Sequence, residues 1–378
     1  MLTDGIYPFV IGGMQKHAYY LAKHLLLNDI DLTIYHCISE NPNPKIDKDL
    51  KNSLGIKESM NFNSKCFKFP KFKISFPCHY LIESYKYSKT LYNEIIKEKK
   101  DFDFIYAKGF SGWYSIIKQN DLPNIGVQFH GLEMFQKSSS FLNYLEKIIL
   151  RLPVKYNLRN ANFIFSYGAK IKSLHEKIGC DPQKIFIQHG GISSDLIINK
   201  KQISNNNKTH FLFIGRDERR KGYRELLKAL KILVHKKNFH FSFIGEIPES
   251  QKLVSSKITY FGIIKNQDDY IKIIDKNDII VVPSISEGLP TVLLESMARG
   301  LAALATDVGA INEIVNNENG YLIKHSNVEE IINVMEIYID LPKSILFKKK
   351  IMALETVEKK FKWEKLSKEF LKFIKENN

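Results

Sequence analysis

Cysteine is scarce in this 378-residue sequence, and the few cysteines present form no recognisable motif. No C-x-x-C spacing occurs, which argues against a disulfide framework or a zinc knuckle, and we expect reduced thiols at Cys37, Cys66, Cys78 and Cys180. No stretch approaches the roughly 18 consecutive apolar residues of a membrane-spanning helix. The opening residues, MLTDGIYPFVIGG, lack the basic and apolar segments of a secretory signal. These absences predict a cytoplasmic protein, at most peripheral on the inner face of the cell membrane.

Acidic residues are in the minority, with 41 Asp and Glu against 56 Lys and Arg, so the formal net charge is +15. Such a surplus favours an anionic partner: a nucleic acid, a membrane surface or a phosphorylated ligand. A nucleic-acid-binding protein would show a basic stripe or a recognised module. Neither is evident, so nucleic acid is the partner that we expect least, and an anionic membrane surface remains a candidate.

Short strand-like runs alternate with helical patterns along the whole chain, which predicts parallel sheets flanked by helices. The length exceeds what one hydrophobic core usually fills, so two domains are expected. A polar, Asn-rich stretch at 199–209 is the best candidate for a linker between a domain at 1–198 and a domain at 210–360. The amphipathic segment 361–378 predicts a terminal helix that packs back toward the first domain. The predicted fold class is α/β with two Rossmann-like, doubly wound parallel-sheet domains.

The segment SISEGLPTVLLESMARG, at 284–300, follows the strand-like run DIIVVP and leads into a helix. Ligands of open α/β sheets bind at the carboxyl ends of strands, where this segment lies. Gly288 allows close approach of a ligand to the backbone, and Pro290 suits the first turn of a helix. The free amides of that turn would form an anion site, and they belong to Leu289, Thr291 and Val292.

Two carboxylates flank this anion site, Glu287 in the loop and Glu295 one turn inside the helix. A carboxylate accepts hydrogen bonds, so its natural partners are hydroxyl groups. We therefore predict that Glu287 binds a transferred sugar and that Glu295 binds a ribose. The alternative is that both are solvated surface residues.

A second strand-to-helix turn carries cations, in FLFIGRDERRKGYRELLKAL at 211–230. Arg216 and Lys221 follow the strand directly and would suit a doubly charged ligand, while Gly215 lies at the strand end. The alternative is a charged loop, because RDERRK mixes both signs.

Together these two segments resemble the E-x7-E signature and the strand–G-R-x4-K-G–helix of the retaining glycosyltransferases of family 4, also called group 1. The resemblance implies the GT-B fold, in which two domains face a cleft that holds a nucleotide sugar. It implies that the second domain binds the donor, with Arg216 and Lys221 neutralising its diphosphate and Glu287 in a catalytic role. Glu246, at another strand end, would line the nucleotide base.

The resemblance extends to the first half of the chain, where the acceptor would bind. In FVIGGMQKHAYYLAKHLL, Gly12 and Gly13 would let the backbone approach the donor phosphate and sugar. In NIGVQFHGLE, His130 follows a strand directly and would orient the reacting sugar. Glu133 would brace His130 or meet the acceptor; the alternative is a surface carboxylate.

The implied reaction is hexosyl transfer from a nucleotide-diphosphate sugar to a glycan or lipid-linked acceptor, with retention of the anomeric configuration. The implied setting is bacterial surface-polysaccharide or lipopolysaccharide biosynthesis. We expect no cofactor and no metal, because the D-x-D sequence at 101–103 precedes an apolar strand and reads as a strand entry. The alternatives are a sugar-nucleotide epimerase of GT-B fold and a non-catalytic remnant.

Two segments depart from the pattern or leave it open. The family normally begins with a full strand, whereas here only Met1 and Leu2 precede Thr3, so a central strand is expected to be short or missing. The segment 65–89 interleaves lysines with aromatic residues. It predicts an irregular basic loop suited to anionic headgroups or a lipid-diphosphate carrier; the alternative is a solvated loop with core aromatics.

Overall fold

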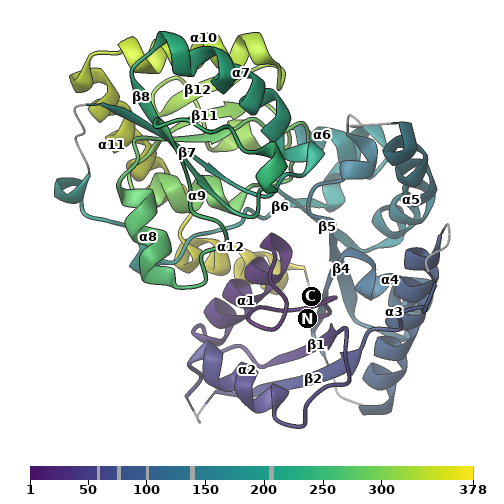
Figure 1. Ribbon diagram of the computed structural model, residues 1–378. Helices are drawn as coiled ribbons and strands as arrows, with labels where there is room; N and C mark the ends of the chain where they lie inside the picture. Colours follow the sequence, from purple (N-terminus) through teal and green to yellow (C-terminus); the bar gives the residue numbers. More distant parts are fainter. Residues whose placement is uncertain (58–59, 75–77, 99–101, 137–140, 204–207, 378) are drawn as a thin grey trace. The chain divides into compact units, whose positions relative to one another are not determined.

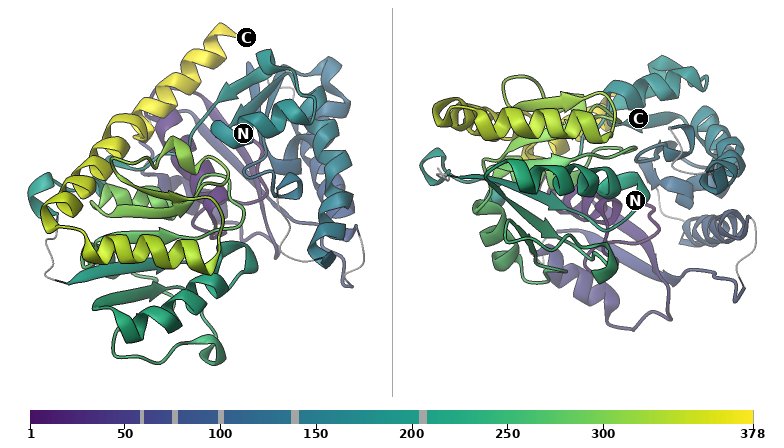
Figure 2. Two further views of the ribbon diagram at one scale, coloured as in Figure 1. Left: turned by 90° about the horizontal axis from the view of Figure 1, so that it is seen from above. Right: turned by 45° about the horizontal axis from the view of Figure 1, so that its top comes forward.

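The computed structural model describes residues 1–378 except 58–59, 75–77, 99–101, 137–140, 204–207 and 378, and it leaves out the side chains of 121 and 141–143. The chain divides into two compact units (Figure 1). Unit 1 contains Met1–Gly191 and Trp363–Asn378, and unit 2 contains Ile192–Lys362. The boundary lies a few residues before the expected linker at 199–209, of which 204–207 fall outside the described residues. In both units helices cover the two faces of a parallel sheet (Figures 1 and 2).

Unit 1 is built from β1 (Leu32–Ile38), β2 (Phe62–Lys68), β3 (Phe104–Lys108), β4 (Asn124–Gln128), β5 (Phe163–Ser166) and β6 (Ile185–Ile187). These strands form a parallel pair, β1-β2, and a parallel group in the order β3-β4-β5-β6. The helices are α1 (Gly13–Leu26), α2 (Ile46–Leu54), α3 (His79–Glu98), α4 (Trp113–Ile117), α5 (Phe141–Asn160), α6 (Ala169–Lys177) and α12 (Trp363–Glu376).

The first residues of the chain join the two strand groups of unit 1. Leu2 makes parallel bridges to Tyr35 of β1 and to Ala107 of β3. Its amide donates to Tyr106 O at 2.8 Å, and its carbonyl accepts from Lys108 N at 2.9 Å. The first strand is therefore reduced to about one residue, yet it satisfies the backbone groups of both neighbours at the centre of the sheet.

The terminal helix α12 belongs to the core of unit 1. Its buried residues Trp363, Leu366 and Phe370 join the apolar side of α1 in one hydrophobic cluster. Gly191 lies so close that a Cβ there would meet the Trp363 ring at 2.8 Å. Apolar residues at helical spacing on α12 thus bury one face against the sheet layer.

The segment 65–89 is not the irregular loop that the sequence suggested. Its first residues extend β2 to Lys68, and α3 begins at His79. Residues 75–77 lie outside the described residues. Tyr87 is buried and donates a hydrogen bond to Thr3 O at 2.7 Å, because α3 packs its apolar side on the sheet. Most of the aromatic residues of the segment therefore lie within β2 or α3 and not in a loop.

Unit 2 is built from β7 (Thr209–Ile214), β8 (Phe239–Ile244), β9 (Ile258–Tyr260), β10 (Ile279–Val282), β11 (Ala302–Thr306) and β12 (Gly320–Ile323). They form a six-stranded parallel sheet in the order β12-β11-β10-β7-β8-β9. The helices are α7 (Tyr223–Lys236), α8 (Gln267–Asp275), α9 (Thr291–Ala298), α10 (Val328–Asp340) and α11 (Lys343–Lys360). The strand order reverses between β7 and β10, so the carboxyl ends of these two strands form the switch point where such sheets bind ligands.

Candidate functional site

The switch point of unit 2 brings together two side chains from distant parts of the sequence. Lys221 ends the short 3-10 helix Arg219–Lys221 that follows β7, and Glu287 lies in the loop that follows β10. Lys221 Nζ donates to Glu287 Oε1 at 2.6 Å. Two residues predicted from separate motifs therefore meet at the carboxyl edge of one sheet.

Glu287 is almost inaccessible to solvent, with 5% of the residue exposed. Besides Lys221, the Ser284 hydroxyl donates to Oε1 at 2.9 Å, and Arg220 Nη1 lies 3.6 Å from Oε2. A buried carboxylate is stable only when cations and donors offset its lost hydration. These contacts fix the Glu287 side chain in one orientation at the sheet edge.

Arg216 occupies a different environment from Lys221. Its side chain is 70% exposed, and its Nη2 pairs with Glu218 Oε1 at 2.5 Å. Arg220 bridges the two carboxylates, because its Nε also lies 2.9 Å from Glu218 Oε2. Arg220 was not singled out from the sequence, although RDERRK contains three arginines at this turn. The structure thus forms a network of three cations and two carboxylates.

Close backbone contacts shape this edge. A Cβ at Gly309 would meet Glu287 O at 2.3 Å, and Ala310 N donates to Gly288 O at 2.8 Å. A Cβ at Gly245 would meet Gly215 O at 2.1 Å. The loop after β7 therefore contacts the loop after β8, and the loop after β10 contacts the loop after β11, each pair through glycine backbone.

The remaining residues predicted in unit 2 lie around the same edge. Pro290 is the N-cap residue of α9, so the amides of Leu289, Thr291 and Val292 belong to the helix entrance. Glu246 follows β8 and is exposed. Glu295 lies inside α9 and is buried, and its Oε2 accepts a hydrogen bond from the Tyr270 hydroxyl at 2.6 Å. The sequence offered no sign of this Tyr270 contact.

A second buried polar cluster lies at the carboxyl edge of the unit 1 sheet, and its centre is Lys108. This residue ends β3 and is completely buried. Its Nζ lies 2.7 Å from His17 Nδ1, 3.3 Å from Met14 O and 3.4 Å from His130 Nε2. His130, which follows β4, also meets the hydroxyl of Tyr167 through Nδ1. Lys108 and Tyr167 were missed in the sequence, although each lies directly at the end of an apolar strand.

The contacts of this cluster depend on which of its groups carry hydrogens. When Lys108 is protonated it can only donate, and His130 then accepts at Nε2 and carries its hydrogen on Nδ1, toward Tyr167. Burial, and then the neighbouring Lys108, hold the pKa of His130 well below its usual range. Burial also holds the pKa of Lys108 well below its usual range. Both imidazole nitrogens of His130 thus have partners inside unit 1.

Asp4 adds a carboxyl group to the same edge of the sheet, because it comes two residues after Leu2, which bridges β1 and β3. Burial raises the pKa of Asp4 to about 6, against the opposing effects of a backbone hydrogen bond and of Lys108. Gly12 and Gly13 lie at the start of α1, as its N-cap and first residue. Glu133 begins the 3-10 helix Glu133–Phe135 and interacts electrostatically with Lys147 of α5.

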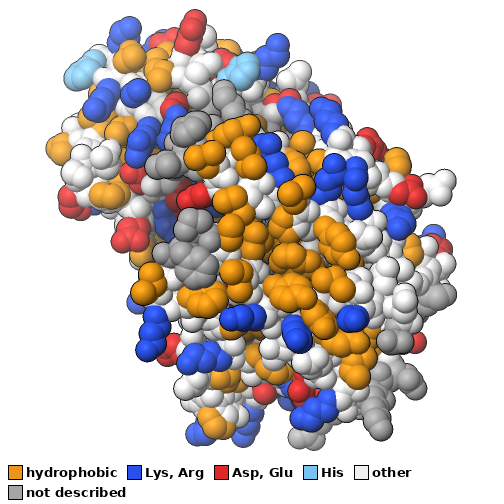
Figure 3. Space-filling view, turned by 90° about the vertical axis from the view of Figure 1, so that its right-hand side faces the viewer, with side chains coloured by type: hydrophobic (Ala, Val, Ile, Leu, Met, Phe, Trp, Pro, Cys, Tyr) orange, Lys and Arg blue, Asp and Glu red, His pale blue; other side chains and the backbone are white. Residues whose placement is uncertain are grey.

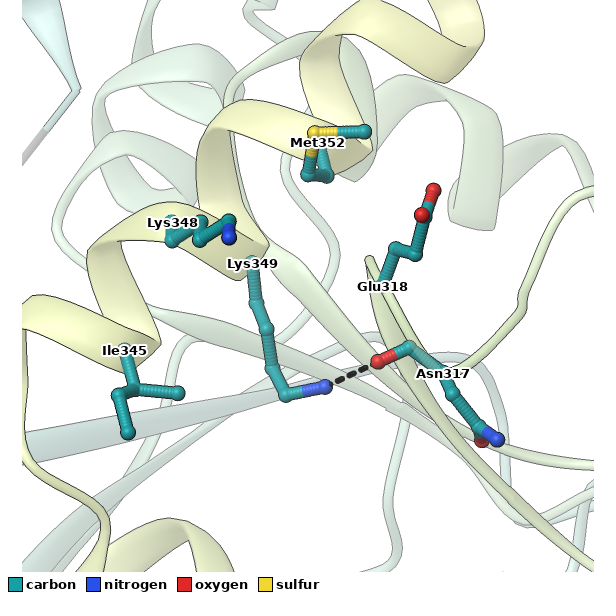
Figure 4. Close-up of a pocket in the computed structure, with 6 residues that line it drawn as sticks. All are labelled: Asn317, Glu318, Ile345, Lys348, Lys349 and Met352. Atoms are coloured by element: carbon teal, nitrogen blue, oxygen red, sulfur yellow. Dashed lines mark hydrogen bonds between the residues drawn. The ribbon is translucent and has the colours of Figure 1, made fainter.

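A hollow of about 210 Å³ in unit 2 lies away from the switch point (Figure 4). It is lined by Asn317 and Glu318, which precede β12, and by residues of α11. Lys349 Nζ donates to Asn317 O at 2.5 Å there. Because this hollow lies at the amino ends of the strands, it is separate from the candidate site. Among the described residues, no group of three or more His, Cys, Asp or Glu side chains is arranged to hold a metal ion.

A family profile described as "Glycosyl transferases group 1" matches residues 195–349. The matched residues lie within unit 2, which contains Ile192–Lys362. An uncharacterized glycosyltransferase from Methanocaldococcus jannaschii is 25% identical over 384 residues, which cover 97% of this chain and 95% of the relative.

The matches to two bacterial relatives cover about half of each relative's length. The capsular polysaccharide biosynthesis glycosyltransferase CapM of Staphylococcus aureus is 29% identical over 217 residues, 51% of this chain and 57% of CapM. The N,N'-diacetylbacillosaminyl-diphospho-undecaprenol alpha-1,3-N-acetylgalactosaminyltransferase of Campylobacter jejuni is 26% identical over 200 residues, 50% of this chain and 52% of the relative.

Solved structures with the same fold span the whole chain. Sucrose-phosphate synthase from Thermosynechococcus elongatus has a TM-score of 0.78 at 15% identity, covering 100% of this chain and 95% of that one. Anabaena HepE in complex with UDP and glucose has a TM-score of 0.69 at 14% identity, covering 99% and 98%. These likenesses confirm the predicted fold class, a GT-B fold of two Rossmann-like parallel-sheet domains.

Proposed function

We propose that this protein is a retaining glycosyltransferase of family 4 that moves a hexosyl group from a nucleotide-diphosphate sugar to a glycan or lipid-linked acceptor. The observation that carries the proposal is the Lys221–Glu287 hydrogen bond of 2.6 Å at the switch point of the group 1 domain. It joins a cation that suits a diphosphate to a carboxylate that suits sugar hydroxyls.

Unit 2 holds the donor in this proposal. Lys221, Arg216 and the amides at the start of α9 neutralise the diphosphate. Glu287, held by Lys221 and Ser284, accepts hydrogen bonds from the sugar hydroxyls, while Gly215 and Gly288 allow backbone to approach the donor. Glu295 and Glu246 are assigned to the nucleoside, with Glu295 sharing its carboxylate between a ribose hydroxyl and Tyr270.

Unit 1 supplies the acceptor side. His130 orients the reacting sugar, and its imidazole is held between Lys108 and Tyr167. Lys108 is thus a positioning residue, because it acts through His130. Gly12 and Gly13 offer backbone at the start of α1, and Glu133 offers a carboxylate to the acceptor.

The transfer step balances without a protein base. The bond between the anomeric carbon and the diphosphate oxygen breaks, and its electron pair goes to the departing oxygen. The acceptor oxygen forms its bond to the anomeric carbon on the same face, and its proton passes to the departing diphosphate. Cations and helix amides stabilise the charge that develops on the leaving group. We expect this step to need neither metal nor cofactor.

The setting that we propose is the assembly of bacterial capsule, lipopolysaccharide or a related surface polysaccharide. The names of the S. aureus and C. jejuni relatives support it, as does the undecaprenol diphosphate in the second name. The UDP in the HepE complex makes UDP-sugars the first donors to test.

A donor screen tests the proposal. UDP-, GDP- and ADP-sugars are added singly in EDTA, and thermal unfolding is followed; the right donor raises the melting temperature because it binds the folded state. Transfer from that donor is then followed by NMR, which should show an unchanged anomeric configuration in the product. An inverted product contradicts retention, and conversion of the donor into its epimer without an acceptor identifies an epimerase.

A further inference from the structure

The solvent-facing side of α5 in unit 1 is apolar. We call it the α5 outer face, and it consists of six side chains that are between 37% and 77% exposed: Tyr144, Leu145, Ile148, Ile149, Leu152 and Tyr156. At 3.6 residues per turn these positions fall within about 140° of the helix circumference. The opposite side of α5 is also largely apolar, since Val154 and Leu158 are completely buried in unit 1. Apolar side chains thus lie on both sides of α5, although only one side is covered by unit 1.

Neighbouring helices extend this apolar area. Ile117 at the end of α4 and Ile96 of α3 are also exposed. Figure 3 shows hydrophobic side chains gathered over this side of unit 1, with Lys and Arg side chains along the margins. In unit 2, by contrast, exposed isoleucines on helices occur singly, one each on α7, α10 and α11: Ile232, Ile337 and Ile345. A contiguous exposed apolar area of this kind marks an interaction site.

The charge on α5 is strongly one-sided. Basic residues recur at every fourth position, at Lys147, Arg151, Lys155 and Arg159, whereas Glu146 is the single acidic residue of the helix sequence. The Arg151 guanidinium lies 5.5 Å from the centre of the Tyr144 ring, so it borders the α5 outer face. Apolar side chains edged by cations are the pattern of helices that lie in the interface of anionic bilayers.

We propose that the α5 outer face docks unit 1 onto the surface of an anionic lipid bilayer. The six apolar side chains enter the boundary between headgroups and acyl chains, and Arg151, Lys155 and Arg159 lie at the level of the lipid phosphates. The contact is interfacial, and no described helix is long and apolar enough to cross a membrane.

Charge favours a bilayer over a second copy of this chain. If two α5 outer faces paired across a two-fold axis, each would present the same helix to the other, with Arg151, Lys155 and Arg159 against the single acidic residue Glu146. Like charges facing one another oppose such pairing. Anionic phosphates instead match Arg151, Lys155 and Arg159, whereas Lys147 is buried in unit 1.

The docking surface is connected to the unit 1 site. Arg151 Nε donates to Met134 O at 2.8 Å, and Met134 lies in the 3-10 helix four residues after His130. A bilayer against α5 would therefore place the His130 edge close to the lipid surface. The consequence that a lipid-linked acceptor is presented there rests on the proposed function; the docking itself does not.

Vesicle binding tests the docking. The full chain is sedimented with vesicles of phosphatidylcholine containing 30% phosphatidylglycerol and with pure phosphatidylcholine vesicles, without any nucleotide sugar. We expect binding to the anionic vesicles, weaker binding to neutral ones, and weaker binding at higher salt. The partition coefficient onto anionic vesicles should fall at least tenfold in the Ile148→Glu/Leu152→Glu variant. It should fall about fivefold in Lys155→Gln, the change expected when one basic residue no longer contacts the anionic surface.

The matched control is Ile337→Glu/Ile345→Glu, which places the same charges at exposed isoleucines of α10 and α11. It should bind as the wild type does. Equal binding of the wild type and the Ile148→Glu/Leu152→Glu variant overturns the proposal. The proposal is also overturned if the wild type does not bind vesicles but forms dimers, and the Ile148→Glu/Leu152→Glu variant is monomeric. That result would assign the α5 outer face to a second copy of the chain. Because no donor is present, vesicle binding is independent of glycosyl transfer.

Discussion

At the scale of single residues, Glu287 and Lys221 depend on one another. Glu287 is buried with Lys221, Ser284 and Arg220 around its carboxylate. A neutral amide at this position keeps the size of the side chain but weakens the charge-assisted hydrogen bonds that fix it. The proposed role of Glu287 therefore depends on its charge as well as its place.

We predict that Glu287→Gln lowers kcat by about two orders of magnitude, the effect expected when a positioning or charge-stabilising contact is lost. Steady-state kinetics with the donor found in the screen measures it. Glu330→Gln is the control, because Glu330 is a hydrogen-bonded carboxylate on α10, outside the site. A Glu287→Gln variant with the turnover of the control would remove Glu287 from the mechanism.

Lys108 should be visible in the pH dependence of activity. Burial, and then Lys108, lower the pKa of His130, so Lys108→Met removes the second cause and raises that pKa part of the way toward its usual value. If transfer needs neutral His130, the acid limb of kcat/KM moves to higher pH in the variant, whereas the wild type stays active at more acidic pH. Lys349→Met, at a buried lysine of unit 2, should leave the limb in place. An unshifted limb in Lys108→Met would contradict the positioning role.

At the scale of elements, the loops after β10 and β11 hold one another through Gly309. The φ of Gly309 is +60°, and a Cβ there would lie 2.3 Å from Glu287 O. The entrance to α9 is therefore set by backbone contact as well as by side chains.

Gly309→Ala should lower kcat about tenfold or more, because the Cβ must displace the loop that carries Glu287. Gly55→Ala is a matched control, since Gly55 has a φ of +67° and open space around its Cβ position. In both variants an alanine must adopt a left-handed backbone conformation, which costs about 1 kcal/mol, so the melting temperature of both should fall slightly. Only Gly309→Ala should have a reduced kcat. Equal kcat values in the two variants would show that the contact between the loops does not affect catalysis.

Much of the fold could be predicted because strands and helices alternate locally in the sequence. Glu287, Lys221 and His130 could be found for the same reason, since each follows a strand and so must lie at a carboxyl edge. The burial of Lys108 could not, because it depends on α1 and β4 packing on β3 from distant parts of the chain. The prediction for segment 65–89 was wrong for a related reason. An aromatic residue such as Tyr87 is buried only when α3 packs on the sheet, and that packing cannot be read from the segment itself.

At the scale of the whole molecule, buried imidazoles make stability depend on pH. Burial lowers the pKa of His175 from 6.5 to about 4. Below pH 6.5 the unfolded chain takes up a proton that the folded protein refuses until about pH 4, so this group lowers stability as the pH falls. The effect fades as the pH rises through 6.5 and is negligible about one pH unit higher.

Removing His175 should therefore flatten the acid side of the stability profile. We predict that His175→Leu gains about 2 kcal/mol relative to the wild type between pH 7.5 and pH 4.5, after any constant packing effect is subtracted. Urea unfolding of the transition that includes unit 1, at both pH values, measures this difference. A difference that does not change with pH would contradict the burial of a neutral His175.

The central claim is that the switch point of unit 2 holds a nucleoside diphosphate on Lys221, and calorimetric titration of UDP tests it most directly, with GDP and ADP titrated where UDP gives no heat. We predict that Lys221→Met weakens the affinity at least tenfold, while Lys108→Met in unit 1 leaves it within twofold. Equal affinity in the wild type and Lys221→Met, or a loss confined to Lys108→Met, would contradict the account.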